Sequence, residues 1–306
     1  MVVRAAKVEA CPRSIECEGV VMKREILVGV DGSGTGLRAV DWAAGEAARR
    51  GCALRLLTAF ALPSGEAAFV WPEDEIRKNS TAVLREAEEH VHEIAPGTEV
   101  ASTTVISAPA ATLVELAETA LMVVVGLRGR GGFPGLRIGS VAYQVAAHCS
   151  VPVVVVGPEP VVDSEAEVVV GLDGSESSED VLAEAFEWAA LTGTRLRAIR
   201  AWTDPMLPAP AMRPMLYDTD RVREAEAAAL HHALSPWKSK YPQVEVVAQV
   251  MEQQPVHALV DAAEHARLLV VGARGRRGFS RLALGGTAHG LLHHAPCPIM
   301  VVHKTP

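Results

Sequence analysis

The sequence predicts an α/β protein made of two tandem copies of one domain, each an open parallel five-stranded sheet with helices on both faces. Short runs of Val, Leu and Ile alternate with amphipathic stretches, which is the order of repeated β-α units. This alternation fills the first half of the chain and then restarts in the second half. A length of 306 residues also leaves room for two domains of ordinary size.

The elements of the first copy follow from hydrophobic periodicity and from turn residues. Ser33 or Thr35 is suited to cap the first helix, and Gly51 is suited to end it. Pro152 opens the last strand and donates no hydrogen bond, so that strand is expected at a sheet edge. The apolar face of the first helix is expected to carry Leu37, Val40, Ala44 and Ala47. Strands are expected at 26–30, 53–60, 99–106, 123–126 and 151–156, and further helices at 74–94, 109–120 and from 140 onward.

Three segments are predicted along the chain. Residues 1–22 show no period and are expected to be a disordered extension, or to precede a true start at Met22. The first domain is placed at 23–158 and the second at 166–304, with a Pro-containing linker between them. The second copy is slightly longer than the first, and its extra residues are expected in the Pro-rich loop at 204–214.

A glycine-rich loop after the fourth strand carries the strongest functional signal. Gly126, Gly129 and Gly139 allow main-chain N–H groups to point inward, and Ser140 opens the next helix. Exposed amides beside a positive helix N-terminus form an anion site, most often for phosphate. Arg128 would add a charge-assisted contact, as would other arginines of the loop.

The same spacing recurs in the second copy, at Gly272, Gly275 and Gly285, with Arg274 in the loop. Two copies, each after a strand and before a helix, indicate a duplicated site of nucleotide size. Bulkier residues at Gly126 and Gly272 are expected to empty both sites while the protein stays folded. The residue that corresponds to Ser140 in the second copy is Gly286, and Thr287 follows it.

A second loop is expected to face each glycine loop. Asp31 and Asp173 follow the first strand of each copy, at the carboxyl edge where open α/β sheets bind ligands. Each would repel phosphate, so a metal bridge or a ribose contact is the functional interpretation, and a turn or helix-cap role the structural one. Ala59 and Ala201, after the second strands, are placed to offer backbone groups to a base.

Composition excludes several classes of protein. The net charge of −8 argues against a nucleic-acid binder, because phosphate backbones require a dense basic surface. No apolar run approaches the roughly 20 residues of a membrane span, and no signal peptide is recognisable. Five cysteines without an even framework indicate a reducing compartment, so a cytoplasmic protein is expected.

Catalytic motifs are missing from the sequence. It contains no Gly-x-x-x-x-Gly-Lys-Ser/Thr loop, no Gly-x-Ser-x-Gly elbow and no His-Glu-x-x-His helix. His148, His293 and His294 fall at the ends of the last helices, where a cation interacts favourably with the helix dipole. No residue is assigned a catalytic role.

The pattern Gly-x2-Gly-x9-Gly-Ser/Thr after a strand, with Asp ending the first strand, resembles the universal stress protein family. More narrowly, it resembles the tandem-domain, ATP-binding members common in actinobacteria, over residues 24–303. The resemblance implies a Rossmann-like or flavodoxin-like strand order 3-2-1-4-5, pairing of the domains through their last strands, a homodimer, and ATP as ligand with Mg²⁺ left open. It assigns to the ATP sites Asp31, Ala59, Gly126, Gly129, Gly139 and Ser140, and Asp173, Ala201, Gly272, Gly275 and Gly285.

Three functions remain open at this point. The first is a regulator of a stress or dormancy response, whose ATP occupancy is read by unidentified protein partners. The second is a slow ATPase or a nucleotide-dependent transferase, and the third is a scaffold that binds no nucleotide. Gly286 departs from the family pattern and removes a hydroxyl, so the second site is expected to bind nucleotide more weakly.

Overall fold

The structure is a computed structural model, and it describes residues 25–61, 73–131, 137–157, 167–175, 177–203, 218–275 and 284–304. The expected extension at 1–22 and the expected insertion at 204–214 lie outside these residues. The first copy contains β1 (Glu25–Gly29), α1 (Gly34–Arg50), β2 (Ala53–Phe60), α2 (Glu73–Ile94), β3 (Val100–Ile106), α3 (Pro109–Leu116), the 3-10 helix η2 (Ala117–Thr119), β4 (Met122–Gly126), α4 (Ser140–His148) and β5 (Val153–Val156).

The second copy repeats this order. It contains β6 (Val168–Gly171), α5 (Ser178–Thr192), β7 (Leu196–Trp202), α7 (Thr219–Lys240), β8 (Val246–Glu252), α8 (Pro255–Ala262), β9 (Leu268–Gly272), α9 (Gly286–His294) and β10 (Ile299–Val302). The strands of the described residues form one sheet in the order β3-β2-β1-β4-β5-β10-β9-β6-β7-β8. Each half therefore has the expected order 3-2-1-4-5, and all neighbours are parallel except β5 and β10.

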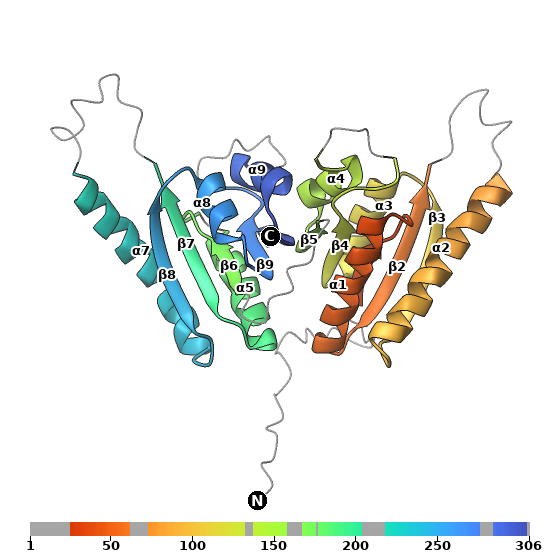
Figure 1. The fold of residues 1–306 in the computed structure, drawn as a ribbon, viewed down its shortest axis with the longest axis horizontal. Coiled ribbons are helices and arrows are strands. Elements are labelled where there is room, and N and C mark those ends of the chain that lie inside the picture. Colours follow the sequence, from red (N-terminus) through yellow and green to blue (C-terminus); the bar gives the residue numbers. More distant parts are fainter. Residues whose placement is uncertain are drawn as a thin grey trace, which may run out of the picture.

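The pairing of β5 with β10 joins the two copies (Figure 1). Val153 is in register with Val301, and Val155 with Ile299. This confirms the expected pairing through the last strands. The edge position predicted from Pro152 holds only within its own copy, because β10 covers the outer side of β5 in the complete sheet. Pro152 precedes the first paired residue, so its missing N–H leaves no gap in the ladder.

Local capping explains the limits of α1. The Ser33 side chain accepts a hydrogen bond from the Gly36 N–H at 3.0 Å, which satisfies a donor that the helix leaves unpaired. Gly51 ends the helix in the left-handed region at φ 61°, where glycine carries no steric penalty. Val40, in the predicted apolar face, is fully buried, but Leu37 is 39% exposed and does not belong to the core. Ala44 and Ala47 are buried with Val40.

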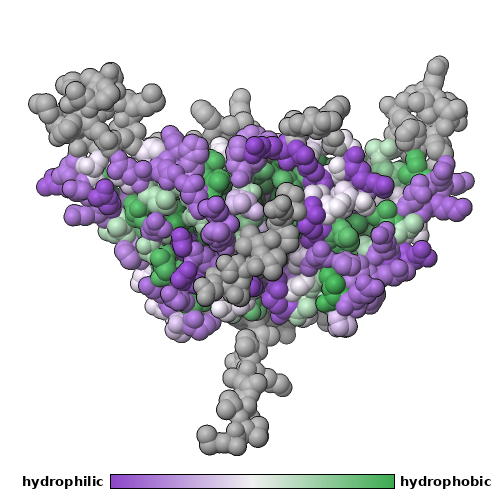
Figure 2. All heavy atoms as spheres, in the orientation of Figure 1, coloured by the Kyte–Doolittle hydropathy of each residue, from purple (hydrophilic) through white to green (hydrophobic). Residues whose placement is uncertain are grey.

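Helices cover both faces of the sheet, as predicted. Alternate residues of the strands enter two separate apolar cores: Ile26 and Val28 pack beneath α1, whereas Leu27 packs on the opposite face with α3 and α4. Each core continues from one copy into the other through the paired last strands. The outer surface over α1, α2, α5 and α7 is mainly hydrophilic, with small separate apolar patches (Figure 2). None of the described helices combines the length and the apolar character needed to cross a membrane.

Charged side chains connect α1 and α5 on one face of the junction. Glu46 is fully buried, and its carboxylate accepts hydrogen bonds from Arg49 and Arg50. Arg50 also reaches Glu187 of α5, with 2.6 Å between nitrogen and oxygen. Burial alone would lower the pKa of Arg50, but Glu46 and Glu187 outweigh burial and raise it above its usual value. The second copy has Trp188 at the position of Glu46, so this ion network belongs to one side only.

We predict that Glu46→Gln lowers the free energy of unfolding by about 3 kcal/mol, because it leaves the guanidinium of Arg50 with too little compensating charge. Urea denaturation followed by circular dichroism measures the change. The matched control is Glu89→Gln, in the exposed pair with Arg85 at 3.7 Å, which should change the free energy by less than about 1 kcal/mol. Equal effects of the two variants would contradict a structural role of the buried network.

Candidate functional site

The topology brings the two predicted loops of each copy together. β1 lies between β2 and β4, so the chain leaves β1 toward one side and reaches β4 on the other. The loops after β1 and β4 therefore leave the same carboxyl edge of the sheet at the point where the strand order reverses, which is where open α/β sheets bind ligands. β6 and β9 have the same relation in the second copy.

In the first copy, the Asp31 carboxylate links the two loops directly. One oxygen, Oδ1, accepts from the N–H of Ser33 at 3.0 Å and from its hydroxyl at 2.6 Å. The other, Oδ2, accepts from the N–H of Arg130 in the glycine loop at 2.8 Å. A Cβ at Gly129 would lie 2.5 Å from this oxygen, so the contact requires a residue without a side chain there. Asp31 thus acts as a turn residue and as the clamp of the glycine loop.

The second copy repeats this clamp. Asp173 accepts from the N–H of Ser175 at 2.9 Å, as Asp31 does from Ser33. A Cβ at Gly275 would lie 2.6 Å from Oδ2 of Asp173, so the carboxylate again lies against the glycine loop. The Ser177 hydroxyl donates to the Arg274 carbonyl at 3.4 Å, and in the first copy Thr35 donates to the corresponding carbonyl.

Main-chain N–H groups converge on each crevice. In the described part of the first copy, the N–H groups of Gly129, Ser140 and Val141 have no hydrogen-bond acceptor. Gly139 is the N-cap of α4 and has no side chain to cap it, in contrast to Ser33 on α1. A Cβ at Gly139 would lie 3.6 Å from the nitrogen of Gly129, which indicates that these amides border one small space.

The second copy offers the same set of groups. The N–H groups of Gly275, Gly286 and Thr287 have no acceptor among the residues that the structure describes. Gly285 is the uncapped N-cap of α9, and a Cβ there would lie 3.3 Å from the nitrogen of Gly275. Gly286 differs from Ser140 in lacking the hydroxyl, and nothing lies within 4 Å of the position of its missing Cβ.

Gly126 and Gly272 are glycines for different reasons. A Cβ at Gly126 would lie 2.6 Å from the carbonyl carbon of Thr35 and 2.8 Å from the nitrogen of Gly36, both in the backbone of α1. At Gly272 the nearest atom would be the Ser177 hydroxyl, at 3.1 Å. That bulkier residues at both positions leave the protein folded stays a prediction, and at Gly126 an added side chain would meet the backbone of α1 and lower stability.

The arginines of the loops are positioned by local contacts. Arg128 donates to the carbonyl of Arg137 at 3.3 Å, across the base of the glycine loop. Arg130 extends toward the first loop, where a Cβ on Gly32 would lie 3.3 Å from its guanidinium. Arg274 contributes its carbonyl to the contact with Ser177. The further arginines of the second loop lie outside the described residues.

Sequence reasoning missed Arg200. It is only 7% exposed in β7, pairs with Glu226 of α7, and its guanidinium would lie 2.9 Å from a Cβ on Gly174, which follows Asp173. The corresponding residue of the first copy is Thr58, whose hydroxyl donates to the carbonyl of Val30 at 2.7 Å. The signal available in the sequence was a second arginine, after Arg197, in a strand whose other residues are apolar.

Ala59 and Ala201 lie at the same carboxyl edge, but inside their strands rather than after them. They are the next-to-last residues of β2 and β7, and each is in register with the neighbouring edge strand, at Val105 and Met251. Both residues are half-buried.

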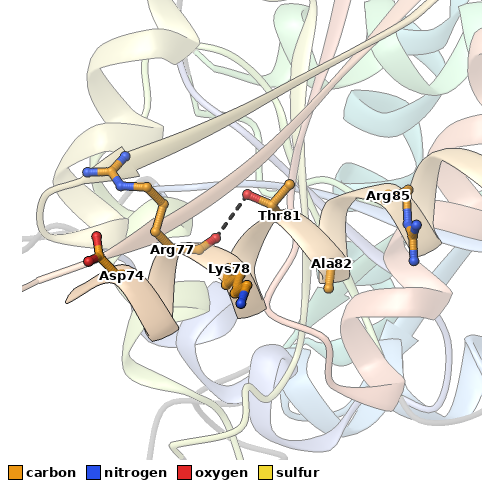
Figure 3. A pocket seen from close by; sticks show the side chains of 6 residues that line it. All are labelled: Asp74, Arg77, Lys78, Thr81, Ala82 and Arg85. Carbon is orange, nitrogen blue, oxygen red and sulfur yellow. Dashed lines mark hydrogen bonds between the residues drawn. The ribbon is translucent and has the colours of Figure 1, made fainter. Parts of the chain in front are cut away.

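The rest of the described chain offers weaker candidates for a functional site. A surface hollow runs along α2 (Figure 3), and all of its lining side chains come from that one helix. The described residues contain no cluster of three or more His, Cys, Asp or Glu side chains arranged to hold a metal ion. The lining residues of the hollow are Asp74, Arg77, Lys78, Thr81, Ala82 and Arg85.

Comparison with known proteins agrees with this architecture. The model of the universal stress protein family matches residues 22–157 and 166–303. Universal stress protein Rv2005c of Mycobacterium tuberculosis is 33% identical over 295 residues, covering 92% of this chain and 97% of that protein. The crystal structure of a universal stress protein from Archaeoglobus fulgidus, 19% identical, has a TM-score of 0.68 over 92% of this chain and 97% of its own, and shares the fold.

The fold defines a tandem α/β protein with two equivalent pairs of loops at the carboxyl edge of its sheet. With the family model and the mycobacterial relatives, this is sufficient for assignment: the chain belongs to the universal stress protein family and carries two of its domains. Another universal stress protein, solved in complex with cAMP, is 33% identical over 44% of this chain with a TM-score of 0.36. One from Archaeoglobus fulgidus was solved in complex with dAMP.

We predict that Gly126→Ala lowers the free energy of unfolding by about 1–3 kcal/mol, because the added methyl group meets the backbone of α1. Gly139→Ala should change it by less than about 0.5 kcal/mol, since its new contacts would be at ordinary distances, the shortest 3.4 Å. Urea denaturation of both variants measures the difference. Similar values for both would mean that the close approach at Gly126 is not a structural constraint.

Proposed function

We propose that this protein binds ATP in both crevices and acts as a nucleotide-dependent regulator of a stress or dormancy response. The observation that supports ATP best is the pair of amide groups at the uncapped N-termini of α4 and α9, together with the N–H of Gly129 or Gly275. Main-chain N–H groups without acceptors at a helix N-terminus favour a phosphate group. The residues proposed to form the two nucleotide sites are those that the family resemblance assigns, together with Arg128, Arg274, Gly286 and Thr287.

Several features favour a nucleotide over a simple anion. Each crevice is bordered by a second strand, through Ala59 or Ala201, where backbone groups are available beside the space for a base. Arg128 and Arg130 in the first copy, and Arg274 in the second, supply positive charge near the proposed phosphates. Membership of a family in which other proteins were solved with cAMP and dAMP is consistent with an adenine nucleotide.

The proposed role of Asp31 changes in the light of its contacts. Both of its oxygens already accept hydrogen bonds, from Ser33 and from Arg130, and these hold the glycine loop. We propose that Asp31 and Asp173 position the amides that bind phosphate.

Regulation is favoured over catalysis. Within the described residues of either crevice, the carboxylates that face the space are Asp31 and Asp173, and each is committed to loop contacts. A general base has to reach an attacking water, and the sequence carries no catalytic motif at these loops. A slow ATPase or a nucleotide-dependent transferase is the alternative, and a single-turnover assay for ADP release at equimolar ATP distinguishes the two.

The proposal includes a cytoplasmic homodimer. Cys149 and Cys297 are free buried thiols, as expected in a reducing compartment. The last strands already pair within one chain, so a second copy would have to meet another surface, and light scattering of the purified protein measures whether it does.

The first test is to identify what the purified protein carries. Heat extraction followed by mass spectrometry should release ATP in about molar amount. Gly139→Val should abolish binding to the first site: the extended backbone there (φ −76°, ψ 151°) suits a β-branched residue, whose side chain would fill the space between the amides. Full ATP retention by a folded Gly139→Val, Gly285→Val double variant would contradict the proposal.

We predict that the second site binds ATP about 10- to 100-fold more weakly than the first, because one hydroxyl contact to a charged phosphate contributes about 1.5–3 kcal/mol. Calorimetry of the Gly285→Val and Gly139→Val variants isolates each site. In the Gly139→Val background, Gly286→Ser should recover most of the lost affinity, since its side chain would enter open space. Gly286→Ala is the matched control, and equal gains in both variants would exclude the hydroxyl as the cause.

A further inference from the structure

Two histidines lie one helical turn apart on α9, beside the junction of the two copies. The imidazole rings of His289 and His293 have centres 4.9 Å apart, and His289 is exposed whereas His293 is half-buried. Tyr143 of α4 meets the His289 ring edge-on at 5.6 Å, with the ring planes at 85°. Tyr143 and His289 occupy the same position in the two copies, and α4 and α9 lie together near β5 and β10 (Figure 1).

The nitrogens of these two rings are not used for hydrogen bonding within the described chain. The neighbouring histidines differ in this respect. His294 faces the guanidinium of Arg137 at 3.3 Å, and His303 contacts the carbonyl of Ala146 at 3.0 Å. His289 and His293 therefore present nitrogen lone pairs that no described protein group occupies.

We propose that His289 and His293 chelate one divalent transition-metal ion, such as Zn²⁺, Ni²⁺ or Cu²⁺, with water completing its coordination. Histidines at i and i+4 share a helix face and bind zinc in this way in other helices. With metal–nitrogen bonds of about 2.0–2.1 Å, two imidazoles on one tetrahedral ion have their centres about 5 Å apart, which matches the observed spacing. Imidazole favours these borderline ions over Mg²⁺.

Positive charge lies close to the pair. Burial lowers the pKa of His293, and His289, His294 and Arg137 lower it further. The guanidinium of Arg137, which also donates to the carbonyl of His293 at 3.3 Å, repels a bound cation. Arg137→Ala is accordingly expected to tighten metal binding, by an amount that falls as salt is added.

This site is separate from the proposed nucleotide crevices. α9 contributes its N-terminus to the second crevice, whereas the metal pair lies in the following turns of the same helix. The proposed site has two protein ligands instead of three or four, so its affinity for a metal ion should be modest. It should bind Cu²⁺ more tightly than Zn²⁺.

The test is calorimetric titration of ZnCl₂ into the full chain, stripped of nucleotide and of any affinity tag. Cys11→Ser and Cys17→Ser should be present throughout, because thiolates also bind zinc. We expect one ion per chain and at least ~10-fold weaker binding in His289→Ala and in His293→Gln. His294→Ala is the matched control and should bind zinc at least as well as the parent protein.

Thermal melting of each variant checks that the fold is retained, and exposed His289 should be replaceable without loss of stability. Binding that is absent from the parent protein, or unchanged in both His289→Ala and His293→Gln, would overturn the proposal. As a second measurement, Cu²⁺ electron paramagnetic resonance should show nitrogen coupling that disappears in the same two variants, and persistence of that coupling would equally overturn it.

Discussion

The candidate site depends on one carboxylate at each sheet edge. Asp31 accepts hydrogen bonds from its own loop and from the glycine loop, and the absence of a side chain at Gly129 is what allows the two loops to approach. Asp173 and Gly275 have the same relation in the second copy. The Asp31 carboxylate therefore orders main-chain N–H groups of the kind that attract anions. Its own oxygens already accept hydrogen bonds from the two loops. The repulsion expected between Asp and phosphate is reduced by this pairing.

The two copies keep the backbone of this arrangement and differ in the side chains around it. Ser140 corresponds to Gly286, Thr58 to Arg200, and Tyr143 to His289. These differences lie at a helix start, near the carboxyl end of a strand and at the junction. The buried strands, by contrast, remain Val- and Leu-rich in both copies, because both faces of the sheet are covered by helices.

The two copies meet at a junction formed by β5 and β10. Pairing of β5 with β10 extends the sheet and merges the apolar cores on each face, so the copies pack as parts of one structure. On one face, the buried network of Glu46, Arg50 and Glu187 connects α1 with α5. Near the last strands, Tyr143 of α4 meets the histidines of α9. The junction is therefore charged and asymmetric on one side and aromatic on the other.

The sequence by itself determined the strands, the duplication and the loops at the carboxyl edges, because these depend on local periodicity and on glycine spacing. It predicted β2 to the residue and the caps of α1. Only the tertiary structure decided that Leu37 is exposed, that the edge strand after Pro152 is covered by β10, that Gly126 packs against a helix backbone, and that Asp31 holds the glycine loop. Each of these is a contact between residues distant in the chain, and such contacts leave no periodic signal in the sequence.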